Sequence, residues 1–390
     1  MMSRFTIPRD IFYGTGSMKE LGKLTGYKRA FIVTDRVIPK LGFLFELNDI
    51  LTSAGMETKV YTGVESDPDI TAVMEGAHLM QEFQPDLIVA IGGGSSIDAA
   101  KAMWIFYEHP AITFDEILKN GTPPLRKKAH LAAIPSTSGT GSEVTSFVVI
   151  SDHANKMKYP IADFDLTPDI AVLDANVAMT MPKRLAAYTG MDALCHAIEA
   201  YVSTNRNNFT NPLAIHAITV LLGYLPPAYD GDVEAKQEVH IAQCMAGMSF
   251  TNAGLGITHS LAHKIGGTFG TPHGLCNAIL MPYVMRYNAK DHMAIRHYAR
   301  ISDRLSLEGQ REMNMLNSLI RAVKDLASYM ELPSCFKDAG IPEEDFLAHK
   351  AEVAHNALLD SCTPTNPRQP TEEDLLRIFE CAYYGNPITF

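Results

Sequence analysis

The feature that most constrains the fold of this chain is a change of hydrophobic rhythm near Pro182. Before it, short, continuously apolar and β-branched runs alternate with stretches of helical periodicity. We predict strands at residues 31–34, 87–91, 131–134 and 170–173, a helix at 70–83, and a more polar hairpin at 147–151 and 156–161. Apolar strands separated by helices are typical of a parallel sheet covered on both faces. The first domain, residues 1–181, is therefore predicted to be α/β.

After Pro182 the strand signals disappear and helical periodicity recurs. The predicted helices cover residues 185–203, 212–225, 234–250, 313–329 and 372–384. Proline at the start of a helix suits the missing N–H of the first helical position, so Pro182 marks a domain boundary. We predict an all-helical second domain over 182–390, packed directly against the first because no low-complexity linker separates them.

Charge and composition narrow the function classes. The 390 residues carry a net charge of -11, which disfavours nucleic acid as a partner. The amino terminus lacks the apolar core of a signal peptide, and no later stretch approaches the roughly 20 apolar residues of a membrane span. The six cysteines are widely spaced without a CxxC pair. We therefore expect a cytoplasmic protein with reduced thiols, no membrane partner and a small neutral substrate.

Two loops suggest a dinucleotide cofactor. Gly92, Gly93, Gly94 and Ser95 follow a predicted strand and open a predicted helix, an arrangement that suits a pyrophosphate at the helix N-terminus. The alternative is a plain tight turn. A second polar loop, residues 135–143, follows the next strand, and ligands of open α/β sheets bind at the carboxyl ends of the strands. Both loops are therefore expected to line one site.

Asp35 is the residue that bears on the choice between NAD and NADP. The fingerprint GxGxxG is absent, since Gly14 and Gly16 are not followed by the third glycine. Asp35 ends the first predicted strand, where a carboxylate accepts hydrogen bonds from the adenosine ribose and repels a 2′-phosphate. We therefore predict NAD, with an ordinary capping or turn aspartate as the alternative.

A carboxylate and several histidines suggest a metal site in the second half. Asp192 and His196 are four residues apart and so share one helix face. His259 and His263 repeat that spacing, and His273 stands near a predicted helix start. A solvated Asp/His pair and surface histidines are the alternatives, but the surroundings are apolar, glycine-rich and scarcely charged, where an unpaired polar group is costly. Nitrogen and oxygen ligands suit Fe²⁺, Zn²⁺, Co²⁺ or Mn²⁺ without choosing among them.

The chain resembles the iron-containing (group III) alcohol dehydrogenases over almost its whole length. The resemblance rests on the runs GGGSSIDAAK, IPSTSGTGSE, GMDALCHAIEAY and HSLAHKIGGTFGTPHGLCNAILMPYV, with YGNP at the carboxyl end. Ser96, Cys195 and Cys276 depart from the residues frequent in the family, but none of these changes removes a ligand. The lactaldehyde reductase, 1,3-propanediol dehydrogenase and methanol dehydrogenase branches look most similar.

The resemblance implies a Rossmann-like first domain, an all-α second domain and an active site in the cleft between them. It implies one divalent metal, Fe²⁺ or alternatively Zn²⁺, held by Asp192, His196, His259 and His273, with His263 as a catalytic residue nearby. The implied NAD-contacting residues are Asp35, Asp67, Gly92, Gly93, Gly94, Ser95, Asp98, Thr137, Ser138 and Lys158. A small pocket would be walled by Phe147, Val149, Phe250, Leu255 and Cys362.

The function that this implies is reversible hydride transfer between NAD(H) and a short-chain primary alcohol or diol, or its aldehyde. The metal would act as a Lewis acid on the substrate oxygen, and His263 would relay a proton. We expect a homodimer or a larger homo-oligomer, since relatives assemble in this way. The alternatives are a metal-dependent lyase resembling dehydroquinate synthase, which would need a pocket rich in Lys and Arg, and a non-enzymatic assembly subunit that keeps the fold.

Overall fold

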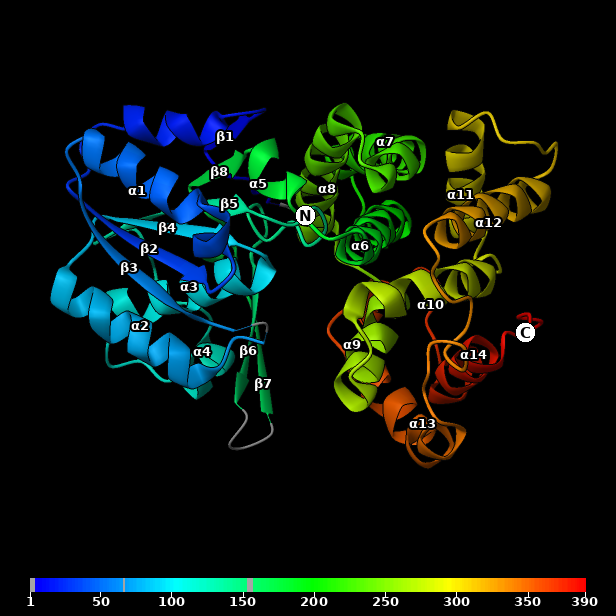
Figure 1. The fold of residues 1–390 in the computed structure, drawn as a ribbon. Helices are drawn as coiled ribbons and strands as arrows, with labels where there is room; N and C mark the ends of the chain where they lie inside the picture. The colour runs from blue at the N-terminus through cyan, green and yellow to red at the C-terminus, as the bar shows by residue number, and fades with distance from the viewer. Residues whose placement is uncertain (1–3, 66, 153–156) are drawn as a thin grey trace. The chain divides into compact units, whose positions relative to one another are not determined.

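The computed structural model describes residues 4–65, 67–152 and 157–390. The chain forms two compact units, one ending at Met181 and the other beginning at Pro182 (Figure 1). Pro182 caps the first helix of the second unit with extended backbone, φ -61° and ψ 144°. The cleft expected between the two domains stays a prediction.

Six of the described strands of the first unit build a sheet in which every pairing is parallel. The spatial order is β1 (Asp10–Tyr13), β8 (Ile170–Leu173), β5 (His130–Pro135), β4 (Leu87–Gly92), β2 (Arg29–Asp35) and β3 (Glu57–Val64). The parallel α/β fold predicted from the alternating runs is confirmed. The two edge strands, β1 and β3, escaped prediction because β1 has four residues and β3 is largely polar.

The sheet is apolar on both faces because neighbouring residues of each strand point to opposite sides. On β4, Ile88 and Ala90 join the cluster covered by α2 (Ile70–Phe83) and α3 (Gly94–Glu108). Leu87, Val89 and Ile91 join the other cluster, which includes α1 (Phe43–Ser53) and the 3₁₀ helix η1 (Ser17–Lys23). This burial on both faces explains why the strand reads as a continuous apolar run. The predicted helix at 70–83 is confirmed as α2.

The strand order places a switch point between β2 and β4. The chain passes from β2 outward to β3, and then returns so that β4 lies on the other side of β2, followed by β5. The carboxyl ends of β2, β4 and β5 are therefore neighbours at one edge, which is where open α/β sheets bind ligands.

A two-stranded antiparallel hairpin extends the first unit, as predicted. Its strands are β6 (Phe147–Asp152) and β7 (Met157–Ala162); the predicted strand start at Lys156 lies outside the described residues. On β6, Val148 and Ile150 are fully buried, whereas Phe147 and Val149 are partly exposed. Short elements α4 (Phe114–Asn120), η2 (Ile38–Leu41), η3 (Phe164–Leu166) and α5 (Ala175–Met179) complete this unit.

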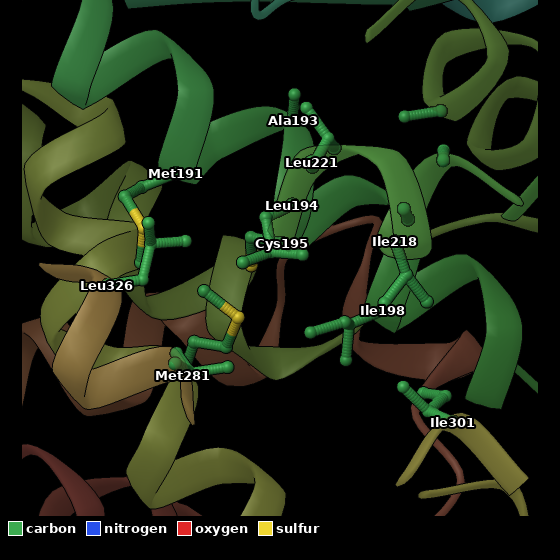
Figure 2. Close-up of a cluster of buried hydrophobic side chains, with 14 of the residues drawn as sticks. Met191, Ala193, Leu194, Cys195, Ile198, Ile218, Leu221, Met281, Ile301 and Leu326 are labelled. Carbon is green, nitrogen blue, oxygen red and sulfur yellow. The ribbon is translucent and has the colours of Figure 1, made fainter. Parts of the chain in front are cut away.

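All regular elements within the fully described segment 182–390 are helices, as predicted. They are α6 (Lys183–Val202), α7 (Thr210–Asp230), α8 (Val233–Ala253), α9 (Ile257–Phe269), α10 (His273–Asn288), α11 (His292–Arg304), α12 (Glu312–Tyr329), α13 (Glu343–Leu358), η4 (Thr363–Thr365) and α14 (Glu372–Tyr384). Figure 2 shows the core around α6, where Leu194 and Ile198 lie near Ile218 and Leu221 of α7 and Met281 of α10. Because α6 is central, its polar side chains face neighbouring helices of the unit.

Among the described helices, α7 alone qualifies as a membrane span by length and mean hydropathy, against the expectation that no segment would. Core helices of soluble proteins meet the same criterion. The helix contains Pro226 and Pro227, and Ala214, Ile218 and Leu221 contribute to the core that surrounds α6. A third of its apolar window, 33%, is buried inside the structure.

Candidate functional site

Asp35, the glycine loop and Thr137 lie at the carboxyl edge of the sheet of the first unit. Asp35 ends β2 and Gly92 ends β4, while the loop after β5 begins with Ser136, whose N–H donates to the Gly92 carbonyl (2.8 Å). A Cβ added at Gly93 would lie 3.5 Å from Thr137 Cγ2. The two polar loops are therefore side by side, as the strand order requires.

The glycine loop has the features that an anion site needs. Gly92 has a φ of 150°, and a Cβ there would collide with Ser96 and approach Asp35 Oδ2 to 3.3 Å. Helix α3 begins after Gly93, which as the N-cap residue lacks a side chain to bond the first-turn N–H groups. These N–H groups, at the positive end of a 15-residue helix, suit a phosphate.

Asp35 also acts as a turn residue, which was the alternative reading of its position. Its Oδ1 accepts hydrogen bonds from the N–H groups of Val37 (2.7 Å) and Ile38 (3.1 Å). The two readings are compatible, because these bonds occupy one oxygen while Oδ2 is near Gly92.

The other predicted cofactor residues are more scattered. Asp67 lies between β3 and α2 and accepts a hydrogen bond from Ser151 Oγ (2.7 Å). Ser138 is buried and Ser95 is partly exposed. Asp98, on α3, has Oδ2 near the N–H of Val149 (3.4 Å), and burial raises the pKa of this carboxyl to about 6 against the lowering effect of Lys101. The side chain of Lys158 lies outside the described residues.

The second unit brings the four predicted metal ligands together from three helices. Asp192 and His196 are one turn apart on α6, His259 is the third residue of α9, and His273 is the first residue of α10. Helix α10 can approach α6 closely because Gly274 packs against the backbone of Tyr188, where a side chain would clash.

Three of the predicted ligands have the spacing that one ion requires, because the donor atoms of Asp192, His196 and His259 all lie within 4.8 Å of one another. Asp192 Oδ1 is 3.9 Å from His196 Nε2, 3.7 Å from His259 Nε2 and 3.4 Å from His273 Nε2. Ligands that each bind one divalent ion at about 2.1 Å are separated by roughly 3.0–4.2 Å, depending on the geometry. Asp192, His196 and His259 therefore fit a divalent metal, and His273 Nε2 lies beside the same carboxylate. The role of all four residues as ligands stays a prediction.

Electrostatics and burial favour a cation at this point. Burial alone would raise the pKa of Asp192, but His196 and the other imidazoles outweigh it and hold this pKa well below its usual range. Asp192, His196 and His259 are buried, whereas the His273 side chain is 40% exposed. His273 is therefore the most exposed of the four predicted ligands.

Asn277 is a member of this cluster that the sequence patterns did not reveal. Its Nδ2 donates to Asp192 Oδ1 (2.7 Å) and lies 3.1 Å from Nε2 of both His259 and His273. The spacing of four residues from His273 on α10 is the only sequence signal for it. The amide marks the point on which three predicted ligands converge.

His263 lies beside the metal cluster on α9 and has its own partner. Its ring stacks on that of His273, with centroids 5.3 Å apart, and its Nδ1 donates to Asp360 Oδ2 (3.1 Å). Lys264 Nζ is 2.8 Å from the same oxygen. Burial would raise the pKa of Asp360, but His263 and Lys264 together hold it below its usual range. His263, Asp360 and Cys362 form another cluster of potential metal-binding side chains. The Lys264 ammonium group beside Asp360 makes this cluster unsuited to a cation.

The predicted pocket residues fall into two groups. In the second unit, Phe250 stacks on the His196 ring (centroids 4.3 Å apart), and Cys362 shares a cluster of donor atoms with His263 and Asp360. Leu255 is buried just before α9. Phe147 and Val149 are partly exposed residues of β6 in the first unit. Their role as pocket walls stays a prediction.

Comparison with known families shows two matches that together span most of the chain. Residues 8–175 match the family described as iron-containing alcohol dehydrogenase, and residues 186–383 match the C-terminal model of the Fe-containing alcohol dehydrogenase family.

Individual relatives agree with these matches. The NADPH-dependent butanol dehydrogenase of Clostridium saccharobutylicum is 49% identical over 390 residues, covering all of both chains. The lactaldehyde reductase of Escherichia coli K12 is 36% identical, covering 98% of this chain and all of that protein. The crystal structure of a 1,3-propanediol oxidoreductase superposes with a TM-score of 0.92 at 31% identity, covering 98% of this chain and all of that one.

Longer relatives contain this fold as one part. The bifunctional aldehyde-alcohol dehydrogenase AdhE of Escherichia coli K12 is 41% identical over 97% of this chain, which spans only 46% of that protein. The resemblance that the sequence motifs predicted is confirmed.

Proposed function

This chain belongs to the iron-containing alcohol dehydrogenase family, and on that premise we propose that it interconverts short-chain primary alcohols or diols and their aldehydes. Butanol, lactaldehyde and 1,3-propanediol, which appear in the names of its relatives, define the substrate class that we propose. The observation that supports the proposal is the approach of His196, His259 and His273 to Asp192 Oδ1, with Nε2 atoms at 3.9, 3.7 and 3.4 Å. The family implies a metal and NAD(P).

The residues present would divide the work as follows. Asp192 and the three histidines would hold the metal, which when bound supplies the Lewis acidity that promotes ionisation of an alcohol. One carboxylate and three neutral imidazoles leave a net charge of +1 around a divalent ion, so an anionic oxygen is attracted to this point. Phe250 covers His196 and limits access of water from that side.

His263 is positioned to move a proton. Asp360 accepts a hydrogen bond from its Nδ1, so the other ring nitrogen, Nε2, can exchange a proton with substrate or solvent. The side chain is 32% exposed, which permits a path to water. We propose that this histidine relays the proton that accompanies hydride transfer.

NAD is the cofactor that we propose, and Asp35 supports it. Its carboxylate stands beside the glycine loop at the switch point, where negative charge opposes a 2′-phosphate. The butanol dehydrogenase relative is named as NADPH-dependent. The choice between NAD and NADP therefore has to be tested with both cofactors.

Iron is the metal that we propose, with zinc as the alternative. The protein is prepared without oxygen, stripped of metal, and reconstituted with Fe²⁺ or Zn²⁺ before assay with butanol, propanediol and lactaldehyde and both nicotinamide cofactors. We expect turnover to depend on the metal and to be lost, together with bound metal, in Asp192→Ala, His196→Ala and His259→Ala, with circular dichroism unchanged. Full metal occupancy and normal turnover in any of these variants would show that the ligand assignment is wrong.

The dehydrogenase reading is preferred over the lyase alternative. Lys264, the cation next to the predicted ligands, already interacts with Asp360, so it does not offer a free positive charge to an acidic substrate. Net production of NADH from an alcohol distinguishes the two activities, because a lyase regenerates its cofactor within each turnover.

The oligomeric state and the cellular location are also proposed. We propose a homodimer or larger homo-oligomer in the cytoplasm, supported by exposed apolar side chains such as Phe45 (79%) and Leu359 (72%) and by six free cysteines. Sedimentation equilibrium is expected to give at least twice the chain mass of 42.8 kDa. A mass equal to one chain at micromolar concentration would contradict the assembly, and recovery in a membrane or secreted fraction would contradict the location.

A further inference from the structure

Glu199 is a buried carboxylate on α6 to which the metal site gives no ligand role. We propose that it is a positioning residue: it orients His259 so that Nε2 is free to bind the metal, and it simultaneously joins the start of α9 to α6. This inference rests on the proposed metal site and extends it to the residue that prepares one ligand.

The spacing on α6 places Glu199 with the predicted ligands. Asp192, His196 and Glu199 are at positions i, i+4 and i+7, which lie on one face of a helix. All three are buried, with Glu199 4% exposed. A buried carboxylate is costly unless it is paired or hydrogen-bonded, so its partners must account for it.

Three donors from the start of α9 surround this carboxylate. Its Oε2 accepts from the N–H of Gly256 (2.9 Å) and from His259 Nδ1 (2.6 Å), and its Oε1 accepts from the N–H of Thr258 (2.8 Å). An ionised carboxylate can only accept hydrogen bonds, so Nδ1 of His259 must carry the hydrogen. In the neutral ring, Nε2 is then unprotonated and directs its lone pair toward Asp192 and Asn277.

A metal bound between Cys195, Glu199 and His259 Nδ1 is the competing interpretation of this group. The distance of 2.6 Å between Glu199 Oε2 and His259 Nδ1 argues against it. Two ligands of one ion at about 2.1 Å each are separated by roughly 3 Å or more. The contact is therefore a hydrogen bond, and Nε2 is the atom left for a metal.

The same carboxylate replaces a missing helix cap. The N-cap residue of α9 is Gly256, whose lack of a side chain leaves the first N–H groups to other partners. Glu199 accepts two of them, and Asn366 Oδ1 lies 3.3 Å from the N–H of Ile257. A Cβ at Gly256 would lie 2.9 Å from Glu199 Oε1 and 2.7 Å from Asn366 Oδ1, so glycine is needed for this close approach. The start of α9 and the orientation of His259 thus both depend on the Glu199 carboxylate.

The first test is Glu199→Gln, which keeps the size of the side chain. A glutamine offers one acceptor oxygen and an NH₂ group, so it cannot accept from all three donors. We expect the affinity of the metal-free protein for Zn²⁺ and Co²⁺ to fall ten- to a hundredfold, measured by competition with a chromophoric chelator.

Asp291→Asn is the matched control, because Asp291 also caps a helix of the second unit but contacts no predicted ligand. Its Oδ1 accepts from the N–H groups of Met293 and Ala294 at the start of α11. We expect its metal affinity to equal that of the wild type. Equal losses of affinity in both variants would overturn the proposal, because a general loss of stability would then explain the effect.

Gly256→Ala tests the same contact without changing any charged group. The added methyl group would displace Glu199 and Asn366, so we expect a loss of metal affinity in the same range as for Glu199→Gln. This variant also decides the matter should Glu199→Gln fail to fold.

Asp192→Asn separates failure of the inference from failure of the proposed function. If Asp192→Asn loses the metal while Glu199→Gln and Gly256→Ala keep wild-type affinity, the metal site stands and the positioning role of Glu199 is wrong. If Asp192→Asn binds metal as tightly as the wild type, the metal site itself is misplaced, and the inference falls with it.

Discussion

Asp35 combines a structural and a recognition role in one side chain. One oxygen accepts two hydrogen bonds from the turn that follows β2, and the other lies near Gly92. Any substitution therefore changes both the turn and the charge at the predicted ribose position. Two variants are needed to separate these effects.

We predict that Asp35→Gly increases the use of NADP relative to NAD on the order of a hundredfold, because it removes repulsion of the 2′-phosphate. Asp35→Asn should show a similar shift while keeping an oxygen to accept the turn hydrogen bonds. The ratio of kcat/KM for the two cofactors decides the matter. A ratio that stays at the wild-type value in both variants would mean that Asp35 does not face the ribose.

His263 differs from the predicted ligands in its carboxylate partner, which is Asp360 and not Asp192, and this suggests a separate role. We predict that His263→Ala retains its metal and its affinity for NAD but loses about 10²–10⁴-fold in kcat and shows an altered pH–rate profile. Metal content and the pH profile are measured on the same preparations. An unchanged profile would remove the proton-relay role, and loss of metal would instead make His263 a ligand.

Helix α3 is joined to the β6–β7 hairpin by a buried lysine. Lys101 Nζ donates to the carbonyl oxygens of Thr145 (2.8 Å) and Phe147 (3.0 Å) and to Thr145 Oγ1 (3.1 Å). Burial lowers the pKa of Lys101 to about 8, although Asp98 and Glu143 raise it. The helix that begins at the glycine loop therefore also holds the strand that carries Phe147 and Val149.

We predict that Lys101→Met destabilises the protein by about 3–5 kcal/mol near neutral pH, since three acceptors and two carboxylates lose their buried cation. The pKa of Lys101 is about 8 in the folded chain, against its ordinary value of 10.5 in the unfolded chain. Between these values the unfolded chain binds more protons, so this lysine makes the free energy of unfolding rise with pH. Urea denaturation of both proteins across this range should show the wild-type advantage growing with pH. A difference that stays constant would contradict the lowered pKa.

The predicted cofactor site and the predicted metal site belong to separate compact units of the chain. The glycine loop and Asp35 are part of the first, and the metal cluster is part of the second. Binding to a folded state stabilises the elements that supply the contacts, so each ligand should protect its own unit.

Removal of the metal by a chelator is expected to increase amide hydrogen exchange in α6, α9 and α10 by tenfold or more, and to leave α1, α2 and the sheet unchanged. NAD should protect the start of α3 instead. Hydrogen exchange with mass spectrometry resolves these segments. Equal loss of protection in both units after chelation would contradict the assignment of the metal to α6, α9 and α10 alone.

The order of the architecture could be predicted from the sequence, and so could the four side chains that we propose as metal ligands. Buried strands such as β4 read directly as continuous apolar runs because both faces of a parallel sheet are covered. Asp192 and His196 could be paired from their spacing because helix geometry is local. The family motifs then indicated which distant histidines belong with them.

Which other side chains contact the proposed site residues could be seen only in the tertiary structure. Glu199 meets Gly256 across 57 positions of the chain, and His263 meets Asp360 across 97. No local period encodes such contacts, because they arise from the packing of helices that are distant in sequence. The edge strands β1 and β3 escaped prediction for a related reason: a short or half-exposed strand is stabilised by its neighbour in the sheet, and its own residues carry little of the pattern.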